Sequence, residues 1–197
     1  MKKFSLALLA LATALAITPA AMATTIEYST NSIATIAPTT GSGMNLAFNG
    51  VTNDIVSTGP SNTPTDSSLG NFVITGSDPT GETFTAVPFS LVVTQSVPGS
   101  GTGTFTSTLT GSIYDDGSNL KVSWNQPSIT IGTVTYALDS YPTITLNNGS
   151  TDDSTSVNAT ISVTPEPSSL LLLGTGLLGL AFVAFRKAKS SGVVLSM

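Results

Sequence analysis

The chain has 197 residues, six of them basic and eleven acidic, and it contains no cysteine and no histidine. The absence of cysteine excludes disulfide frameworks, cysteine-ligated zinc and thiol nucleophiles, and the absence of histidine removes the commonest general base and transition-metal ligand. Between residues 24 and 164, ten acidic residues accompany a single basic residue, Lys121. Because such a surface repels nucleic acid, we expect no nucleic-acid partner.

Residues 1–23 have the pattern of a secretory signal peptide. The segment begins with two lysines and continues with an uncharged apolar stretch. A helix-breaking proline follows. Ala21 and Ala23 then place small residues at the two positions that a signal peptidase reads, so we expect cleavage after Ala23. The alternatives, an uncleaved anchor or a buried helix, agree less well with the position, length and charge of the segment.

Residues 24–162 predict an all-β exterior domain, an antiparallel β-sandwich of which a jelly roll is one variant. Threonine and serine dominate, turn-forming residues occur at intervals, and alternation of apolar and polar residues replaces any helical period. A long surface loop is expected over residues 53–70. In chain order, strands are expected over residues 25–28, 44–48, 71–75, 83–87, 89–94, 103–114, 120–124, 129–131, 134–138, 143–147 and 157–163.

The clearest of these strands is residues 103–114, in which Phe105, Ser107 and Leu109 face one way and the intervening threonines face the other. A Gly-containing loop over residues 115–119 joins it to the next strand in a predicted hairpin. Gly132 and the residue after it are expected to form a bulge or turn.

Catalysis is not expected of this domain. Without histidine and cysteine, a Ser–His–Asp triad and a Cys–His pair are impossible. A Ser–Lys pair would have to use Lys121, and Ser123 on the same strand face stands roughly 7 Å away. Two opposed carboxylates of the glycosidase kind stay open, although most of the acidic residues occupy turn-like contexts, where aspartate shapes the backbone. We therefore predict that the protein is not an enzyme.

Two oxygen-rich loops, residues 115–119 and 147–153, raise the question of a cofactor. Calcium takes about six to eight oxygen ligands, which acidic turns can supply. Neither loop has the ligand spacing of an EF-hand. A solvated turn is the favoured interpretation, so we expect no cofactor, with calcium as the alternative.

Trp124, Tyr136 and Tyr141 are the aromatic residues that could form a flat platform for stacking sugar rings. A lone tryptophan in a β-sandwich more often lies in the core. The core interpretation is therefore favoured, and the platform is kept as an alternative.

Residues 168–185 form an uncharged stretch that predicts a single transmembrane helix. At about 1.5 Å per residue these 18 residues span roughly 27 Å, close to a bilayer core of about 30 Å. Arg186, Lys187 and Lys189 follow and are expected to stop transfer and remain in the cytoplasm. Three glycines and a threonine within the helix suggest a face for a membrane-embedded processing enzyme, although such residues are also common in membrane helices.

Pro165, Glu166 and Pro167, the apolar helix with its glycines and the basic cluster together resemble the PEP-CTERM sorting signal of Gram-negative bacteria. The resemblance extends from Val163 to Lys187. It implies that the three motif residues are recognition residues for exosortase, a membrane protease-transpeptidase. We assign residues 163–189 to this sorting signal and residues 190–197 to a short tail.

The resemblance also implies a route and a location. Signal peptidase and an exosortase-like protease are the expected processing partners, with a tethered intermediate in the inner membrane that faces the periplasm. Cell surface or extracellular matrix is the expected destination, and extracellular polysaccharide the associated material. The predicted function is that of a structural surface or matrix protein; the alternative is a carbohydrate-binding module, with or without calcium.

Overall fold

The computed structural model describes residues 23–33, 36–40, 43–59, 62–76, 79–115, 117–146, 154–164 and 168–191. The chain divides into two compact units. The exterior domain lies in the unit formed by residues 21–164, and the C-terminal helix α2 belongs to the other unit.

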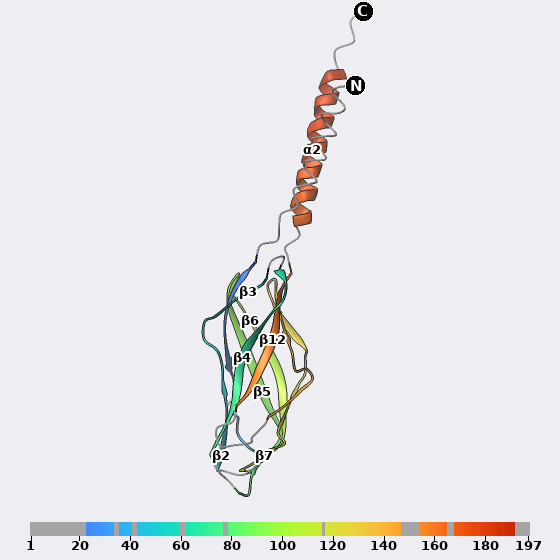
Figure 1. Cartoon of the computed structure of the whole chain (residues 1–197). Coiled ribbons are helices and arrows are strands. Elements are labelled where there is room, and N and C mark those ends of the chain that lie inside the picture. Colours follow the sequence, from blue (N-terminus) through green and yellow to red (C-terminus); the bar gives the residue numbers. More distant parts are fainter. Residues whose placement is uncertain are drawn as a thin grey trace, which may run out of the picture. The chain divides into compact units, whose positions relative to one another are not determined.

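The exterior domain consists of two antiparallel sheets (Figure 1). The seven-stranded sheet has the order β11-β8-β6-β5-β1-β3, with β7 paired to β6, and the five-stranded sheet has the order β2-β4-β12-β10-β9. The strands are β1 (Thr25–Ser32), β2 (Met44–Asn49), β3 (Asp54–Ser57), β4 (Thr65–Gly76), β5 (Glu82–Val97), β6 (Gly101–Tyr114), β7 (Gly117–Ser118), β8 (Lys121–Trp124), β9 (Ser128–Ile131), β10 (Val134–Leu138), β11 (Thr143–Thr145) and β12 (Ser154–Val163).

The inner faces of the two sheets share one hydrophobic core. Phe72 on β4 meets Phe89 on β5 with ring centroids 5.0 Å apart, and Phe89 in turn meets Trp124 on β8 at 6.1 Å. These tilted and edge-on contacts are the arrangements that aromatic rings prefer. Because the contact of Phe72 with Phe89 crosses from one sheet to the other, the two antiparallel sheets pack face to face, as the sequence predicted.

Alternation in the sequence located the strand faces correctly. Phe105, Ser107 and Leu109 are buried, as are Val134, Tyr136 and Leu138 on β10. The predicted hairpin is present, since β6 pairs with β8 in antiparallel register. Gly132 has a φ of 60° in the turn between β9 and β10, which confirms the turn expected there.

Two details of the strand prediction are wrong. The long loop expected over residues 53–70 contains all of β3 and the first half of β4. Its polar residues form ladder hydrogen bonds with β1 and β12, and Tyr28 is paired with Asp54; this pairing overrides the loop-like composition. Residues 83–87 and 89–94 belong to one strand, β5, which a bulge between Phe84 and Val87 interrupts.

Polar side chains also connect the two sheets through the interior. Oγ1 of Thr30 on β1 donates to the carbonyl of Leu69 on β4 at 2.6 Å. Oε1 of Glu82, which is fully buried at the start of β5, accepts from the backbone N–H of Met44 on β2 at 2.6 Å. Such bonds require a specific alignment of the two sheets. If the alignment changed, the buried polar groups would lose their partners, which costs folding free energy.

The helix α2 (Ser168–Ser191) begins where the sequence predicts, and it continues through the basic cluster. Among the residues that the structure describes, no helix is long and apolar enough to cross a membrane. The expected transmembrane helix over residues 168–185 is therefore not supported.

Candidate functional site

The strand that leads to the C-terminal motif occupies the centre of the five-stranded sheet. Strand β12 lies between β4 and β10 (Figure 1), and it pairs with both in antiparallel register. Val157, Ala159 and Ile161 point into the core and have no exposed surface. The last segment of the exterior domain is thus also one of its most firmly held elements.

The support for β12 becomes one-sided at its C-terminal end. Pairing with β4 ends at Ile161, opposite Thr65, whereas pairing with β10 continues through Val163, opposite Val134. One residue further, the backbone N–H of Thr164 donates to the carbonyl of Thr133 at 2.9 Å. The next residue in the sequence is the first proline of the Pro-Glu-Pro motif.

Pro165, Glu166 and Pro167 lie outside the described residues. Within α2 the guanidinium of Arg186 lies over the ring of Phe182, 5.8 Å from its centroid. This is the distance of a cation–π contact between residues one helical turn apart. The backbone of Lys189 is helical and its side chain is not described.

The glycines of α2 are open to approach from outside. A methyl group added at Gly174, Gly176 or Gly179 would meet no atom of the described part of the chain within 4 Å. Close approach of a second helix needs small residues of this kind. The described part of α2 is therefore compatible with recognition by another helix.

A comparison with protein families matches residues 163–187 to the PEP-CTERM protein-sorting motif. The chain carries a PEP-CTERM sorting signal. The PEP-CTERM signal implies export, a membrane-anchored intermediate and processing by exosortase, a membrane protease. Comparisons with curated proteins and with solved structures find no match for the chain. The PEP-CTERM match includes Val163, so signal and folded domain share the end of β12.

At the other end of the domain, folding begins directly after the predicted signal-peptidase site. Ala23 is exposed, whereas Ala21 lies outside the described residues. The backbone N of Thr24 donates to Oγ1 of Thr58 at 2.9 Å, and the N–H of Thr58 donates to the carbonyl of Thr24 at 3.0 Å. Oγ1 of Thr24 donates to Oδ1 of Asn62. Cleavage after Ala23 would leave the nitrogen of Thr24 as a new α-amino group within this hydrogen-bonded corner.

The aromatic platform considered for sugar binding is wrong. Trp124 has 4% of its surface exposed and Tyr136 has none, because both point into the core. Tyr141 alone is exposed, at 45%. Among the described residues, the indole N–H of Trp124 finds no hydrogen-bond partner. The buried ring contributes apolar packing that offsets the cost of this unpaired N–H.

The first oxygen-rich loop, residues 115–119, contains the short strand β7, and two of its side chains hydrogen-bond to nearby backbone. Oδ1 of Asn119 accepts from the backbone N–H of Ser112 at 2.6 Å, and Oγ of Ser118 accepts from the N–H of Leu120 at 3.1 Å. Asp116 and the second loop, residues 147–153, lie outside the described residues. In the described part of the chain, no three His, Cys, Asp or Glu residues are grouped as metal ligands.

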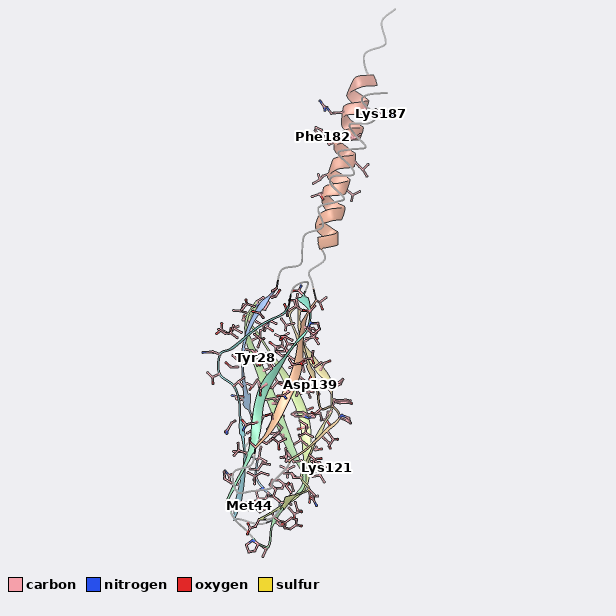
Figure 2. All side chains as sticks on the ribbon, in the orientation of Figure 1. Tyr28, Met44, Lys121, Asp139, Phe182 and Lys187 are labelled. Carbon is pink, nitrogen blue, oxygen red and sulfur yellow. The ribbon has the colours of Figure 1, made fainter. Side chains whose placement is uncertain are left out.

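A pair of carboxylates that the sequence did not single out meets on the outer face of the five-stranded sheet. Oγ1 of Thr160 lies 2.9 Å from Oδ1 of Asp66 and 2.9 Å from Oδ1 of Asp139 (labelled in Figure 2). One hydroxyl proton can be donated to only one of them at a time. The residues lie on β4, β12 and the segment after β10, so only the tertiary pairing of these strands brings them together.

A second polar cluster lies inside the sandwich around Tyr28 (Figure 2). Its phenol oxygen is 2.7 Å from the carbonyl of Ser68, 2.9 Å from Oγ of Ser67 and 3.0 Å from Oδ2 of Asp54. Burial raises the pKa of the Tyr28 phenol well above its ordinary value; the bond to Ser67 lowers this pKa, and the Asp54 carboxylate raises it. The cluster joins β1 and β3 to β4, so its role is structural.

Lys121 and Ser123 keep the shared strand face that the sequence predicted. Both point away from the core, whereas their neighbours Val122 and Trp124 are buried. Lys121 is exposed to solvent.

Proposed function

We propose that the exterior domain is a non-catalytic structural protein of the cell surface or extracellular matrix that associates with extracellular polysaccharide. Export and sorting follow from the PEP-CTERM signal. The matrix role is our inference, and one feature of the folded domain supports it.

That feature is the outer face of the seven-stranded sheet, which carries rows of hydroxyl groups. Cross-strand pairs on this face join hydroxyl residues to one another, as in Thr94 with Thr102 and Thr108 with Ser123. We define the hydroxyl face as the outward serines and threonines of β1, β5, β6, β8 and β11: Ser29, Ser90, Thr94, Thr102, Thr104, Thr106, Thr108, Thr110, Ser123, Thr143 and Thr145.

The hydroxyl face also differs in charge from the rest of this acidic domain. Lys121, the one basic residue between residues 24 and 164, lies on this face opposite Thr110, and Glu27 lies on the same face two residues before Ser29. Sugar carboxylates would therefore meet less repulsion here than elsewhere on the domain. β-branched threonines on a sheet have restricted rotamers, which limits the entropy lost on binding.

Many weak contacts suit a matrix protein better than one deep site would. A single hydroxyl–hydroxyl hydrogen bond contributes little net free energy, about 0.5–1.5 kcal/mol. A polymer that contacts several rows at once adds these contributions within one binding event. The buried positions of Trp124 and Tyr136 remove the stacking platform on which a module for one particular sugar would depend.

Co-sedimentation with polysaccharide extracted from the producing cells tests this function. The variant Thr108→Glu with Ser123→Glu places two carboxylates directly opposite each other on the hydroxyl face. The matched control, Thr130→Glu with Thr135→Glu, does the same on the outer face of the other sheet. Both double substitutions introduce a similar cross-strand repulsion between two carboxylates.

We expect the full chain to co-sediment, the hydroxyl-face variant to lose most of this binding and the control to keep it. Absence of binding by the unchanged chain would contradict the matrix role. Equal loss in both variants would contradict the assignment to the hydroxyl face.

A further inference from the structure

The PEP-CTERM match and the folded domain overlap in sequence, because the match begins at Val163 and β12 ends there. We propose that residues 162–164, which we name the β12 tip, must separate from β10 before exosortase can process the sorting signal. The β12 tip thereby sets the rate of processing, and Ile161 limits how far the strand opens. This inference concerns the sorting step and does not depend on the matrix role.

Both ends of β12 are paired with a single strand: the N-terminal residues Ser154–Asn158 pair with β4, and the β12 tip pairs with β10. Ile161 pairs with Thr65 on one side and with Tyr136 on the other. Ser162 and Val163 pair only with β10. Strand ends of this kind open at lower free energy than the two-sided interior of a sheet.

Burial changes at the same position. Ile161 has no exposed surface, whereas Val163 is only partly buried and packs against the edge of the core. Opening the strand as far as Ser162 therefore uncovers little apolar surface, and opening it past Ile161 would uncover the core. The strand can open over three residues without unfolding the domain.

A protease cannot hold the β12 tip while β10 holds it. Enzymes that bind an extended peptide do so through its backbone N–H and C=O groups. The N–H of Thr164 already donates to the carbonyl of Thr133 at 2.9 Å, and one N–H makes one strong bond. Each backbone bond that must first be broken lowers the fraction of open chain by roughly 2- to 10-fold.

A reversible disulfide can fix the β12 tip in its closed position. Since Thr133 and Thr164 share a backbone bond, the adjacent pair of Val134 and Val163 is a non-hydrogen-bonded one, with Cα atoms about 4.5 Å apart. This separation lies within the range for a disulfide. The natural chain has no cysteine, so Val134→Cys with Val163→Cys creates a bridge without a competing partner.

The experiment follows processing of the full chain by detergent-solubilised membranes that contain exosortase, with and without dithiothreitol. We expect the oxidised double variant to be processed at least 10-fold more slowly than the same chain after reduction. The chain with Val163→Cys alone, treated in the same way, reports any effect of the reductant on the protease itself.

A second variant frees the signal without altering the fold. It inserts a copy of Ser162-Val163-Thr164 between Thr164 and Pro165, so the original tip can stay paired with β10 while the copy precedes the motif. Processing should become several-fold faster than in the unchanged chain. Insertion of the same three residues between Gly99 and Ser100, in the exposed turn before β6, is the matched control and should leave the rate unchanged.

Equal processing of the oxidised and reduced double variant would overturn the proposal. So would an insertion before Pro165 that leaves the rate where it is in the unchanged chain. Either result would mean that exosortase reads the signal without needing the β12 tip.

Discussion

The phenol of Tyr136 on β10 donates a hydrogen bond to Oε1 of Gln95 on β5, 3.0 Å away, and thereby connects the two sheets inside the core. The amide nitrogen of the same side chain is also hydrogen-bonded: Nε2 of Gln95 donates to the carbonyl of Gly99 at 2.9 Å. Both side chains are buried. The pair fixes how β10 lies against β5, and β10 is the strand that holds the β12 tip.

Tyr136→Phe removes the phenol hydroxyl, keeps the ring, and leaves Oε1 of Gln95 buried without its partner. We expect the free energy of unfolding to fall by about 1–3 kcal/mol, the cost of an unsatisfied buried acceptor. Urea denaturation of the full chain in detergent measures this change. Tyr141→Phe, at an exposed position, is the control and should change stability by less than about 0.5 kcal/mol. An unchanged midpoint for Tyr136→Phe would show that the bond to Gln95 does not stabilise the fold.

Stability should also depend on alkaline pH through Tyr28 and Tyr136. Burial raises the pKa of both phenols, and each is raised further by a neighbour, Asp54 for Tyr28 and Tyr28 for Tyr136. In the unfolded chain a phenol titrates near pH 10. The stabilisation is therefore complete below about pH 10 and is lost above it, because the unfolded chain releases protons that the folded chain retains.

Unfolding free energies measured in urea from pH 8 to pH 12 check this expectation. Each phenol contributes a slope of up to about 1.4 kcal/mol per pH unit in the alkaline range. Tyr28→Phe and Tyr136→Phe should each remove one such contribution. A stability that stays level up to pH 12 would contradict the burial of these two side chains.

Trp124 gives a spectroscopic test of the core. It is the one tryptophan of the chain, and 4% of its surface is exposed. We expect blue-shifted fluorescence that added polysaccharide does not quench. Trp124→Ala should cost about 3–5 kcal/mol, whereas Trp124→Phe should cost much less, because it retains most of the ring volume and removes an unpaired buried N–H. Red-shifted emission that sugar quenches would show instead that Trp124 is exposed and contacts sugar, as the stacking platform requires.

Calcium should have no effect on stability if the oxygen-rich loops are ordinary turns. We expect the melting temperature of the full chain to change by less than about 1 °C on addition of millimolar calcium or of a chelator, since a ligand that binds only the folded state would raise stability by RT ln(1 + [L]/Kd). A clear rise with calcium that the chelator reverses would establish a bound ion.

Much of the exterior domain was predictable because its strands alternate cleanly. In β10 the alternate residues Val134, Tyr136 and Leu138 are apolar and buried, and in the second half of β12 the alternate residues Val157, Ala159 and Ile161 are apolar and buried as well. The first half of β4 was not predictable in the same way, because residues 65–68 are all polar and resemble a loop. They form a strand because β12 supplies the ladder partners, from Ile161 opposite Thr65 onwards. The composition of residues 65–68 does not indicate that pairing.

The sorting signal was predictable from its local pattern, whereas its connection to the fold was not. Pro165 to Pro167 and the basic cluster are contiguous in sequence, and the family comparison detects the sorting motif over residues 163–187. The central place of β12 in its sheet depends on strands more than 80 residues earlier in the chain. The contact of Asp66 and Asp139 with Thr160 depends on the same pairing, so no local signal could have indicated either feature.

The intact mass of the exported form tests the account most directly. Mass spectrometry of the protein recovered outside the inner membrane should show a chain that begins at Thr24 and ends between Thr164 and Ser168, with β12 complete and α2 removed. An exterior form that still contains α2, a product cut within β12 before Ile161, or an intact chain found only in the cytosol would contradict it.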